Sequence, residues 1–117
     1  GEEEQRKAIR SVYEREGYVL DTHTAVAYAS YSEYKKLVND EHKTVIASTA
    51  SPYKFAESVV FAIEGKKSGE WESVEKLKEL SKVKIPNAVE EVRNADIRHN
   101  LECDIADMKK TVKDILV

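Results

Sequence analysis

Residues 18–64 read YVLDTHTAVAYASYSEYKKLVNDEHKTVIASTASPYKFAESVVFAIE, and this stretch decides the fold that the sequence predicts. Residues 18–20 form a short apolar run, and residues 44–49 form a second run without polar alternation. Such runs are typical of strands that are buried on both faces, as in a parallel sheet. Residues 22–38 and 52–64 follow these runs and carry helical patterns. The sequence therefore predicts an α/β fold, a small parallel β-α-β-α unit with a right-handed crossover.

The ends of the predicted helices carry capping residues. Asp21 and Ser51 stand where an N-cap side chain is wanted, and Pro52 occupies the first helical position after Ser51. Gly17 and Gly65 stand where a helix ends in a left-handed residue. These signals indicate where each helix of the unit begins and ends.

Helical patterns flank this unit on both sides. A charged helix is expected over residues 2–16, with its acidic residues first. The chain is expected to divide into an α/β segment, 1–66, and a helical C-terminal segment, 67–117. The later helices are expected at residues 70–81, after Pro86, and after Asp104 as a cap.

The small sheet raises a physical problem. Two parallel strands make a poor independent sheet, because parallel sheets need several strands and cover on both faces. We therefore expect the chain to be a piece cut from a larger sheet. The alternative is that another chain supplies the missing edge.

Composition and charge exclude several classes of protein. Of the 117 residues, 41% are hydrophobic and 35% charged, which is too apolar for a disordered chain. The net charge of −3 predicts no nucleic-acid or anionic-membrane surface. No apolar run approaches the roughly 20 residues of a membrane span. The single cysteine, Cys103, allows neither an internal disulfide nor a multi-cysteine zinc site, and it favours a reducing, cytoplasmic location.

Two polar stretches, residues 20–27 and 47–55, mark a possible binding rim. Each lies at the junction of a predicted strand and the following helix N-terminus. Ligands of open α/β sheets bind at such junctions, where hydroxyls and backbone N–H groups are available. This chemistry predicts a small polar or anionic ligand, although helix capping alone explains most of these side chains.

The rim carries two motifs, Asp21-x-His23-Thr24-Ala25-Val26-Ala27 and Ser48-Thr49-Ala50-Ser51-Pro52-x-Lys54-Phe55, and the tail carries Pro86, Ala95-Asp96 and His99-Asn100-Leu101. At this spacing the set resembles the C-terminal part of threonine synthase, from about residue 10 onward. The resemblance implies a pyridoxal-phosphate enzyme of the tryptophan-synthase-β fold type. Such enzymes convert O-phosphohomoserine and water to threonine and phosphate.

The resemblance implies roles for four residues. Thr49 would be the neutral hydroxyl partner of the cofactor's ring nitrogen, and Asp21 and His23 would lie on the cofactor side of the rim. Lys54 would meet the substrate phosphate. Each residue also has a plainer structural alternative. Thr49 could simply begin a turn, and Asp21 could be a helix cap. His23 could be a polar residue of the first helical turn, and Lys54 could be a solvated lysine. No catalytic residue and no metal ligand is expected within the chain.

The sequence also departs from the family. It has Thr22 where the family commonly has proline and Ser51 where it often has histidine. It offers neither the Schiff-base lysine nor a glycine-rich phosphate loop, since its four glycines are isolated. We therefore expect a fragment that is inactive in isolation and binds no pyridoxal phosphate alone. Its partner would be the remainder of the enzyme chain.

Two other functions stay open at this point. The chain could be a stand-alone interaction module derived from that enzyme, forming a homodimer or a strand-exchanged oligomer through its sheet edges. It could also be a small α/β domain with an unrelated ligand at the rim. Under the fragment interpretation, helix faces that lost their neighbours should leave a large exposed apolar patch.

Overall fold

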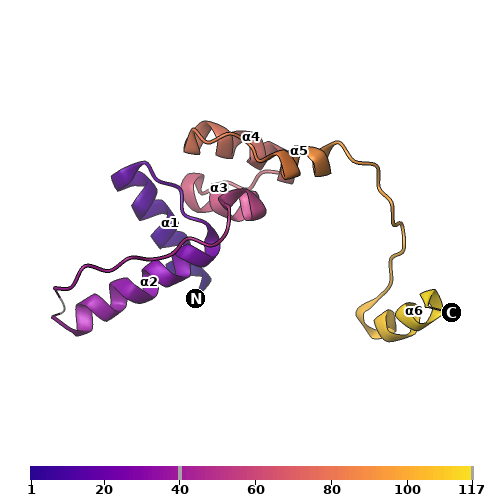
Figure 1. The fold of residues 1–117 in the computed structure, drawn as a ribbon, viewed down its shortest axis with the longest axis horizontal. Helices are drawn as coiled ribbons and strands as arrows, with labels where there is room; N and C mark the ends of the chain where they lie inside the picture. Colours follow the sequence, from indigo (N-terminus) through magenta and orange to yellow (C-terminus); the bar gives the residue numbers. More distant parts are fainter. Residues whose placement is uncertain (40, 117) are drawn as a thin grey trace.

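The computed structural model describes residues 1–39 and 41–116 and shows an all-helical chain across them. The described residues form six α-helices, two of them preceded by a short 3₁₀ turn, and Figure 1 shows their arrangement. They are α1 (Glu2–Glu16), α2 (Thr22–Leu37), α3 (Ala56–Glu64) after η1 (Pro52–Phe55), α4 (Glu70–Ser81), α5 (Asn87–Arg93), and α6 (Met108–Ile115) after η2 (Ile105–Asp107).

The predicted α/β fold with its small parallel sheet is wrong. Residues 18–20 and 44–49 are extended but form no strand in the described part of the chain, and no backbone ladder joins them. Val19 and Leu20 are buried against helices. A short apolar run predicts that its residues are buried, but it does not distinguish burial in a sheet from burial between helices. Residues 44–49 run back toward the start of α2 with Val45 93% exposed. A strand needs a neighbour for its backbone groups, and the described chain offers none.

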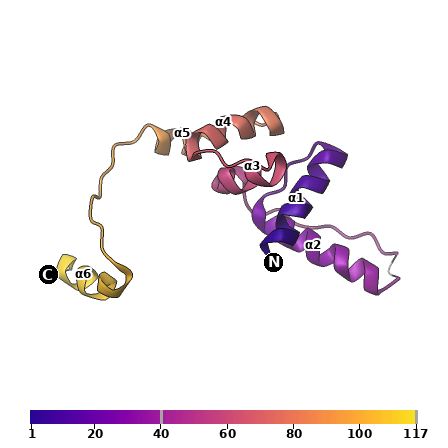
Figure 2. The same ribbon diagram turned by 180° about the vertical axis from the view of Figure 1, so that it is seen from behind.

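The core lies where the first four helices meet. α1 contacts α2 and α3, and α3 contacts α4 (Figure 2). Ile9, Val59, Val60 and Leu77 are fully buried at these contacts. The apolar positions recur at helical spacing on α1 and α3, so burying one face of each helix builds the core.

The predicted helix ends are largely confirmed. Gly17 and Gly65 end α1 and α3 in left-handed conformations, with φ of 66° and 73°. Ser51 caps η1 by accepting a hydrogen bond from the Tyr53 N–H, with Pro52 in the first position. Asp104 precedes η2, but its side chain makes no capping hydrogen bond, so that part of the prediction is wrong.

The last part of the chain leaves the helical body. Residues 95–104, here called the arm, extend from the end of α5 and carry α6 away from the other helices (Figure 1). The described chain is consequently elongated, with extents of 60 × 32 × 24 Å. None of the described helices combines the length and apolarity that crossing a membrane requires. The division of the chain into two segments, residues 1–66 and 67–117, stays a prediction.

Candidate functional site

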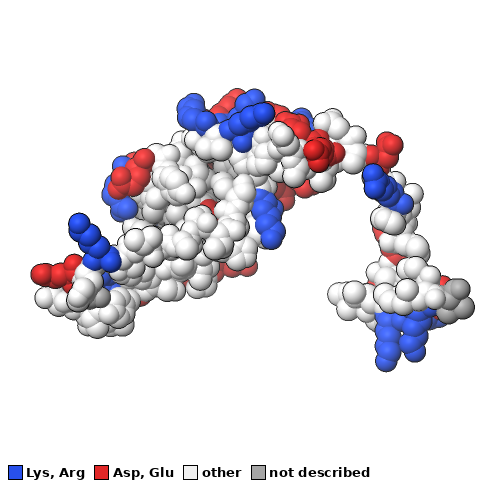
Figure 3. All heavy atoms as spheres, viewed as in Figure 1, with Lys and Arg blue, Asp and Glu red and all other residues white. Residues whose placement is uncertain are grey.

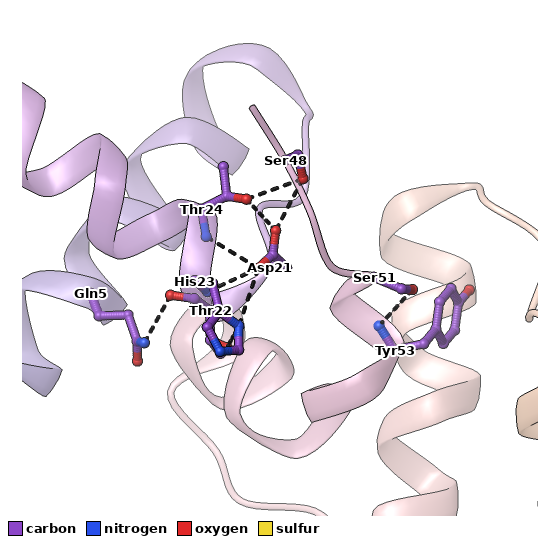
Figure 4. A network of polar contacts seen from close by, with 8 residues as sticks. All are labelled: Gln5, Asp21, Thr22, His23, Thr24, Ser48, Ser51 and Tyr53. Carbon is purple, nitrogen blue, oxygen red and sulfur yellow. Dashed lines mark hydrogen bonds and ion pairs between the residues drawn. The ribbon is translucent and has the colours of Figure 1, made fainter. Parts of the chain in front are cut away.

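The centre of the candidate site is the Asp21 carboxylate at the start of α2 (Figure 4). Asp21 is only 1% exposed. Its Oδ1 accepts hydrogen bonds from the backbone N–H groups of His23 and Thr24, at 2.9 and 3.1 Å. These bonds satisfy two N–H groups that have no partner within the helix. The predicted N-cap at Asp21 is therefore confirmed.

The same carboxylate also binds the second motif. Ser48 Oγ donates to Asp21 Oδ2 at 3.0 Å, and Thr24 Oγ1 donates to the same oxygen. The two hydroxyl oxygens lie 3.1 Å apart. Ser48 is 27 residues from Asp21 in the sequence, so this contact holds the extended segment against the start of α2. One buried carboxylate thus joins the two motifs.

Hydrogen bonding decides the ionisation of Asp21. Burial alone would raise the pKa of this carboxyl, because the charged form loses water. The bonds from the Thr24 side chain and backbone, from Ser48 and from the His23 N–H act in the opposite direction and prevail. The pKa of Asp21 therefore lies below its usual value of 3.8, and the group is an anion at neutral pH.

Two of the predicted site residues lie around Phe55. The His23 side chain is 60% exposed, with Nδ1 3.6 Å from Asp21 Oδ1. Its ring centroid lies 5.6 Å from that of Phe55. Lys54 Nζ lies 5.5 Å from the same Phe55 centroid. The structure therefore brings Asp21, His23 and Lys54 into one neighbourhood, with Phe55 between the histidine and the lysine.

Thr49 is placed differently from its neighbour Ser48. Both residues are exposed, but Ser48 directs its hydroxyl to Asp21, whereas no hydrogen bond from a described residue engages the Thr49 hydroxyl. Because Ser48 is held in place, the next residue along the backbone is positioned too. Thr49 thus carries a hydroxyl that bonds to no described residue, next to Ser48, which its hydrogen bond to Asp21 holds in place.

The turn that follows Thr49 is held by Tyr53. This residue is buried, and its hydroxyl donates to the backbone carbonyl oxygen of Val83 at 2.6 Å. Burial raises the pKa of Tyr53 above 10.0, against a smaller opposing effect from Ser81. The tyrosine therefore stays protonated and keeps donating this bond across the physiological range. The bond fixes η1, which carries Lys54 and Phe55.

A groove opens beside this turn. Its volume is about 500 Å³, and Ser51, Lys54 and Phe55 contribute to its lining. Asp21, His23 and Thr49 do not line it. Of the residues of the predicted rim, Lys54 therefore lines the groove, whereas Asp21, His23 and Thr49 lie outside it. Among the described residues, no three His, Cys, Asp or Glu side chains are grouped so as to hold a metal ion.

Sequence reasoning missed three members of this site, namely Thr24, Ser48 and Phe55. All three stand inside the two motifs, so a signal was present. Phe55 is the last residue of η1 and is 40% exposed, with His23 and Lys54 beside its ring. The hydroxyls of Thr24 and Ser48 become recognisable as site residues only once the fold brings them to the same carboxylate.

Comparison with known proteins identifies a family. A family model described as threonine synthase, C-terminal, matches residues 24–103, about two thirds of the chain. The match includes Thr24, Ser48, Thr49 and Lys54, and it ends before η2 and α6. No curated protein matches the chain.

Proposed function

The chain belongs to the threonine synthase C-terminal family, and we propose that it forms the C-terminal wall of a threonine synthase active site. That enzyme would convert O-phosphohomoserine and water to threonine and phosphate. The remainder of the enzyme chain would be the partner of this segment. The exposed Cys103 suits a reducing, cytoplasmic setting for such an enzyme.

One observation carries this proposal, the hydrogen bond from Ser48 Oγ to Asp21 Oδ2. It joins the two motifs that predicted the family, although they are far apart in the sequence. It also anchors Ser48 and leaves the adjacent Thr49 hydroxyl exposed to a ligand. Catalytic and binding groups need such support, because a side chain that moves freely loses orientation.

The donor set fits pyridoxal phosphate, which supplies an electron sink when it is bound. Thr49 would offer its hydroxyl to the ring nitrogen. Asp21 is ionised, but its oxygens are taken up by bonds from within the chain. Its proposed role is therefore to position Ser48 and Thr49. A neutral hydroxyl, and not a carboxylate, then faces the ring nitrogen.

His23 and Lys54 complete the proposed wall. The exposed imidazole of His23 is held between Asp21 and Phe55 and can donate or accept a hydrogen bond at the rim. Lys54 would place a positive charge near the phosphate of the substrate, acting as a point charge. Both residues remain accessible to a ligand in the described structure.

The remainder of the enzyme would have to supply two further parts. These are the lysine that anchors the cofactor and the loop that holds the cofactor phosphate. The four glycines of this chain are isolated in the sequence and build no phosphate loop of backbone N–H groups. We therefore propose that the chain is inactive alone.

Phosphate release from O-phosphohomoserine tests the proposal. The purified chain with pyridoxal phosphate should release none, and adding the remainder of the enzyme should restore turnover. In that complex, Thr49→Ala should lower kcat by about tenfold, the effect of losing one hydrogen bond of about 1.4 kcal/mol. Thr49→Ser keeps the hydroxyl and serves as the matched control. Turnover by the chain alone, or equal activity of both variants and the parent, would contradict the proposal.

A further inference from the structure

Helix α6 has an apolar face that nothing in the described structure covers. Its apolar residues, with those of η2, recur at helical spacing on one side and are all exposed: Ile105, Met108, Val112, Ile115 and Leu116. Figure 3 shows the basic side chains of α6 gathered on one side of the helix. An exposed apolar face of this kind marks an interaction surface.

The groove beside η1 has the complementary character. Aromatic and aliphatic side chains line it, among them Tyr53, Phe55, Trp71, Val74, Val89 and Val92. Val92 is 67% exposed although it lies on α5 at the groove wall. A groove of about 500 Å³ with this lining suits the apolar side chains of an amphipathic helix.

Charges at the edges of the two surfaces also match. The charged side chains that line the groove are Glu57, Glu70 and Lys54, so the lining carries one more negative than positive charge. On α6, Lys109 and Lys113 come one position after Met108 and Val112, so they flank the apolar face on the same side. A helix seated by its apolar face would bring these lysines toward the acidic residues of the groove. Such complementarity favours one orientation of the helix.

We propose that α6 of one copy binds the groove of a second copy, and that two copies exchange their C-terminal helices reciprocally. The arm begins at the end of α5, which forms one wall of the groove, and leads away from it (Figure 1). Two such contacts related by a two-fold axis would close the assembly. Because α6 lies beyond the family match, this contact goes beyond the proposed enzyme function.

The arm favours a second copy over the chain's own groove. To seat its own α6, the chain would have to reverse direction within residues 95–104. In the described structure, residues 96–104 run without a turn and make no such reversal. The extended arm already presents α6 outward, where another molecule can reach it without any reversal. Exchange of this kind is a common route to dimers.

The mass of the 117-residue chain in solution, measured by sedimentation or light scattering, tests the exchange. The parent should be a dimer. Val112→Asp on α6 and Val92→Asp at the groove should each raise the dissociation constant of the dimer at least tenfold, since each places a charge in the apolar contact. Leu37→Asp is the matched control, because Leu37 is 84% exposed on α2, outside both surfaces. It should leave the dimer intact.

Mixing the two variants separates exchange from other modes of association. The Val92→Asp chain keeps its α6, and the Val112→Asp chain keeps its groove. They should therefore form a heterodimer at a concentration where each alone is monomeric. All three positions are exposed in the single chain, so each variant should keep the helical content of the parent, and circular dichroism checks this folding. A monomeric parent, a dimer that neither variant weakens, or a mixture that stays monomeric would overturn the proposal.

Discussion

At the scale of single residues, Asp21 connects what the sequence shows to what the fold adds. An aspartate followed by a helical pattern predicts an N-cap, and the two bonds to His23 and Thr24 confirm it. The bond from Ser48 could not be predicted in the same way, because it depends on how a distant segment returns to α2. Local chemistry is readable from local sequence, whereas tertiary contacts require the fold.

The lowered pKa of Asp21 predicts a pH dependence of stability. The unfolded chain binds a proton at Asp21 at higher pH than the folded chain does. Stability from this group is therefore present above pH 3.8 and is lost as the pH falls through the lower pKa of the folded state. Urea unfolding of the parent and of Asp21→Asn, measured from pH 7 downward, checks this. The variant should be less stable at pH 7 by about 1–3 kcal/mol.

The difference in the free energy of unfolding between the parent and Asp21→Asn should shrink below pH 3.8. Asp96→Asn is a suitable control, because Asp96 is exposed in the arm and makes no hydrogen bond to a described residue. The free energy of unfolding of Asp96→Asn should equal that of the parent at every pH. A stability difference for Asp21→Asn that stays constant down to acid pH would contradict the assigned role of the ionised carboxylate.

At the scale of elements, helices were predictable and strands were not. The expected helix at residues 70–81 coincides with α4, and α2 ends one residue short of the expected 22–38. Their apolar spacing and caps are properties of each segment alone. A strand depends on partners elsewhere in the chain. The apolar runs at 18–20 and 44–49 therefore could not show by themselves whether these residues form strands. Val19 and Leu20 of the first run are buried between helices, whereas most residues of the second run are exposed.

The left-handed end of α3 supports a prediction about glycine. Gly65 has φ of 73°, which costs about 1–2 kcal/mol for a residue with a Cβ atom. Gly65→Ala should lower the free energy of unfolding by about that amount. The new Cβ would only touch Arg10 Nη2 at 3.4 Å, so strain in the backbone dominates.

Gly69→Ala is the matched control for this change. Gly69 has φ of −67°, and a Cβ there would meet nothing within 4 Å. Gly69 is the N-cap of α4, where alanine is less favourable, but the stiffer unfolded chain offsets this loss, so the net effect on the free energy of unfolding should be about 0.5 kcal/mol or less. Equal effects of the two substitutions in chemical denaturation would show that the helix does not end in a left-handed residue at Gly65.

At the scale of the whole molecule, a helical body and an extended arm explain the exposed apolar surface. Val45, Val92 and the face of α6 are apolar and exposed. The sequence argument expected a large apolar patch on the faces of the helices at residues 22–38 and 52–64, and the size of that patch stays a prediction. The structure places exposed apolar side chains on an extended segment, at the wall of a groove and on a terminal helix.

This arrangement predicts where a protease cuts first. Arg98 lies in the exposed arm without regular structure, whereas Lys76 lies within α4 and pairs with Glu64 and Glu72. Trypsin should cleave after Arg98 before it cleaves after Lys76, because cleavage needs locally unfolded backbone. Mass spectrometry of a time course checks the order. Earlier cleavage after Lys76 would show that the helical body is less stable than the arm.

The most direct test of the account is a double-mutant cycle between Asp21 and Ser48, since their contact joins the two motifs that define the candidate site. The free energies of unfolding of Asp21→Asn, Ser48→Ala and the double variant are compared with that of the parent. We expect a coupling energy of about 1 kcal/mol, within the range for groups in one hydrogen-bond network. If the two single substitutions change the free energy of unfolding additively, to within about 0.3 kcal/mol, Asp21 and Ser48 do not interact. That result would contradict the contact between the two motifs and the proposed wall of the active site.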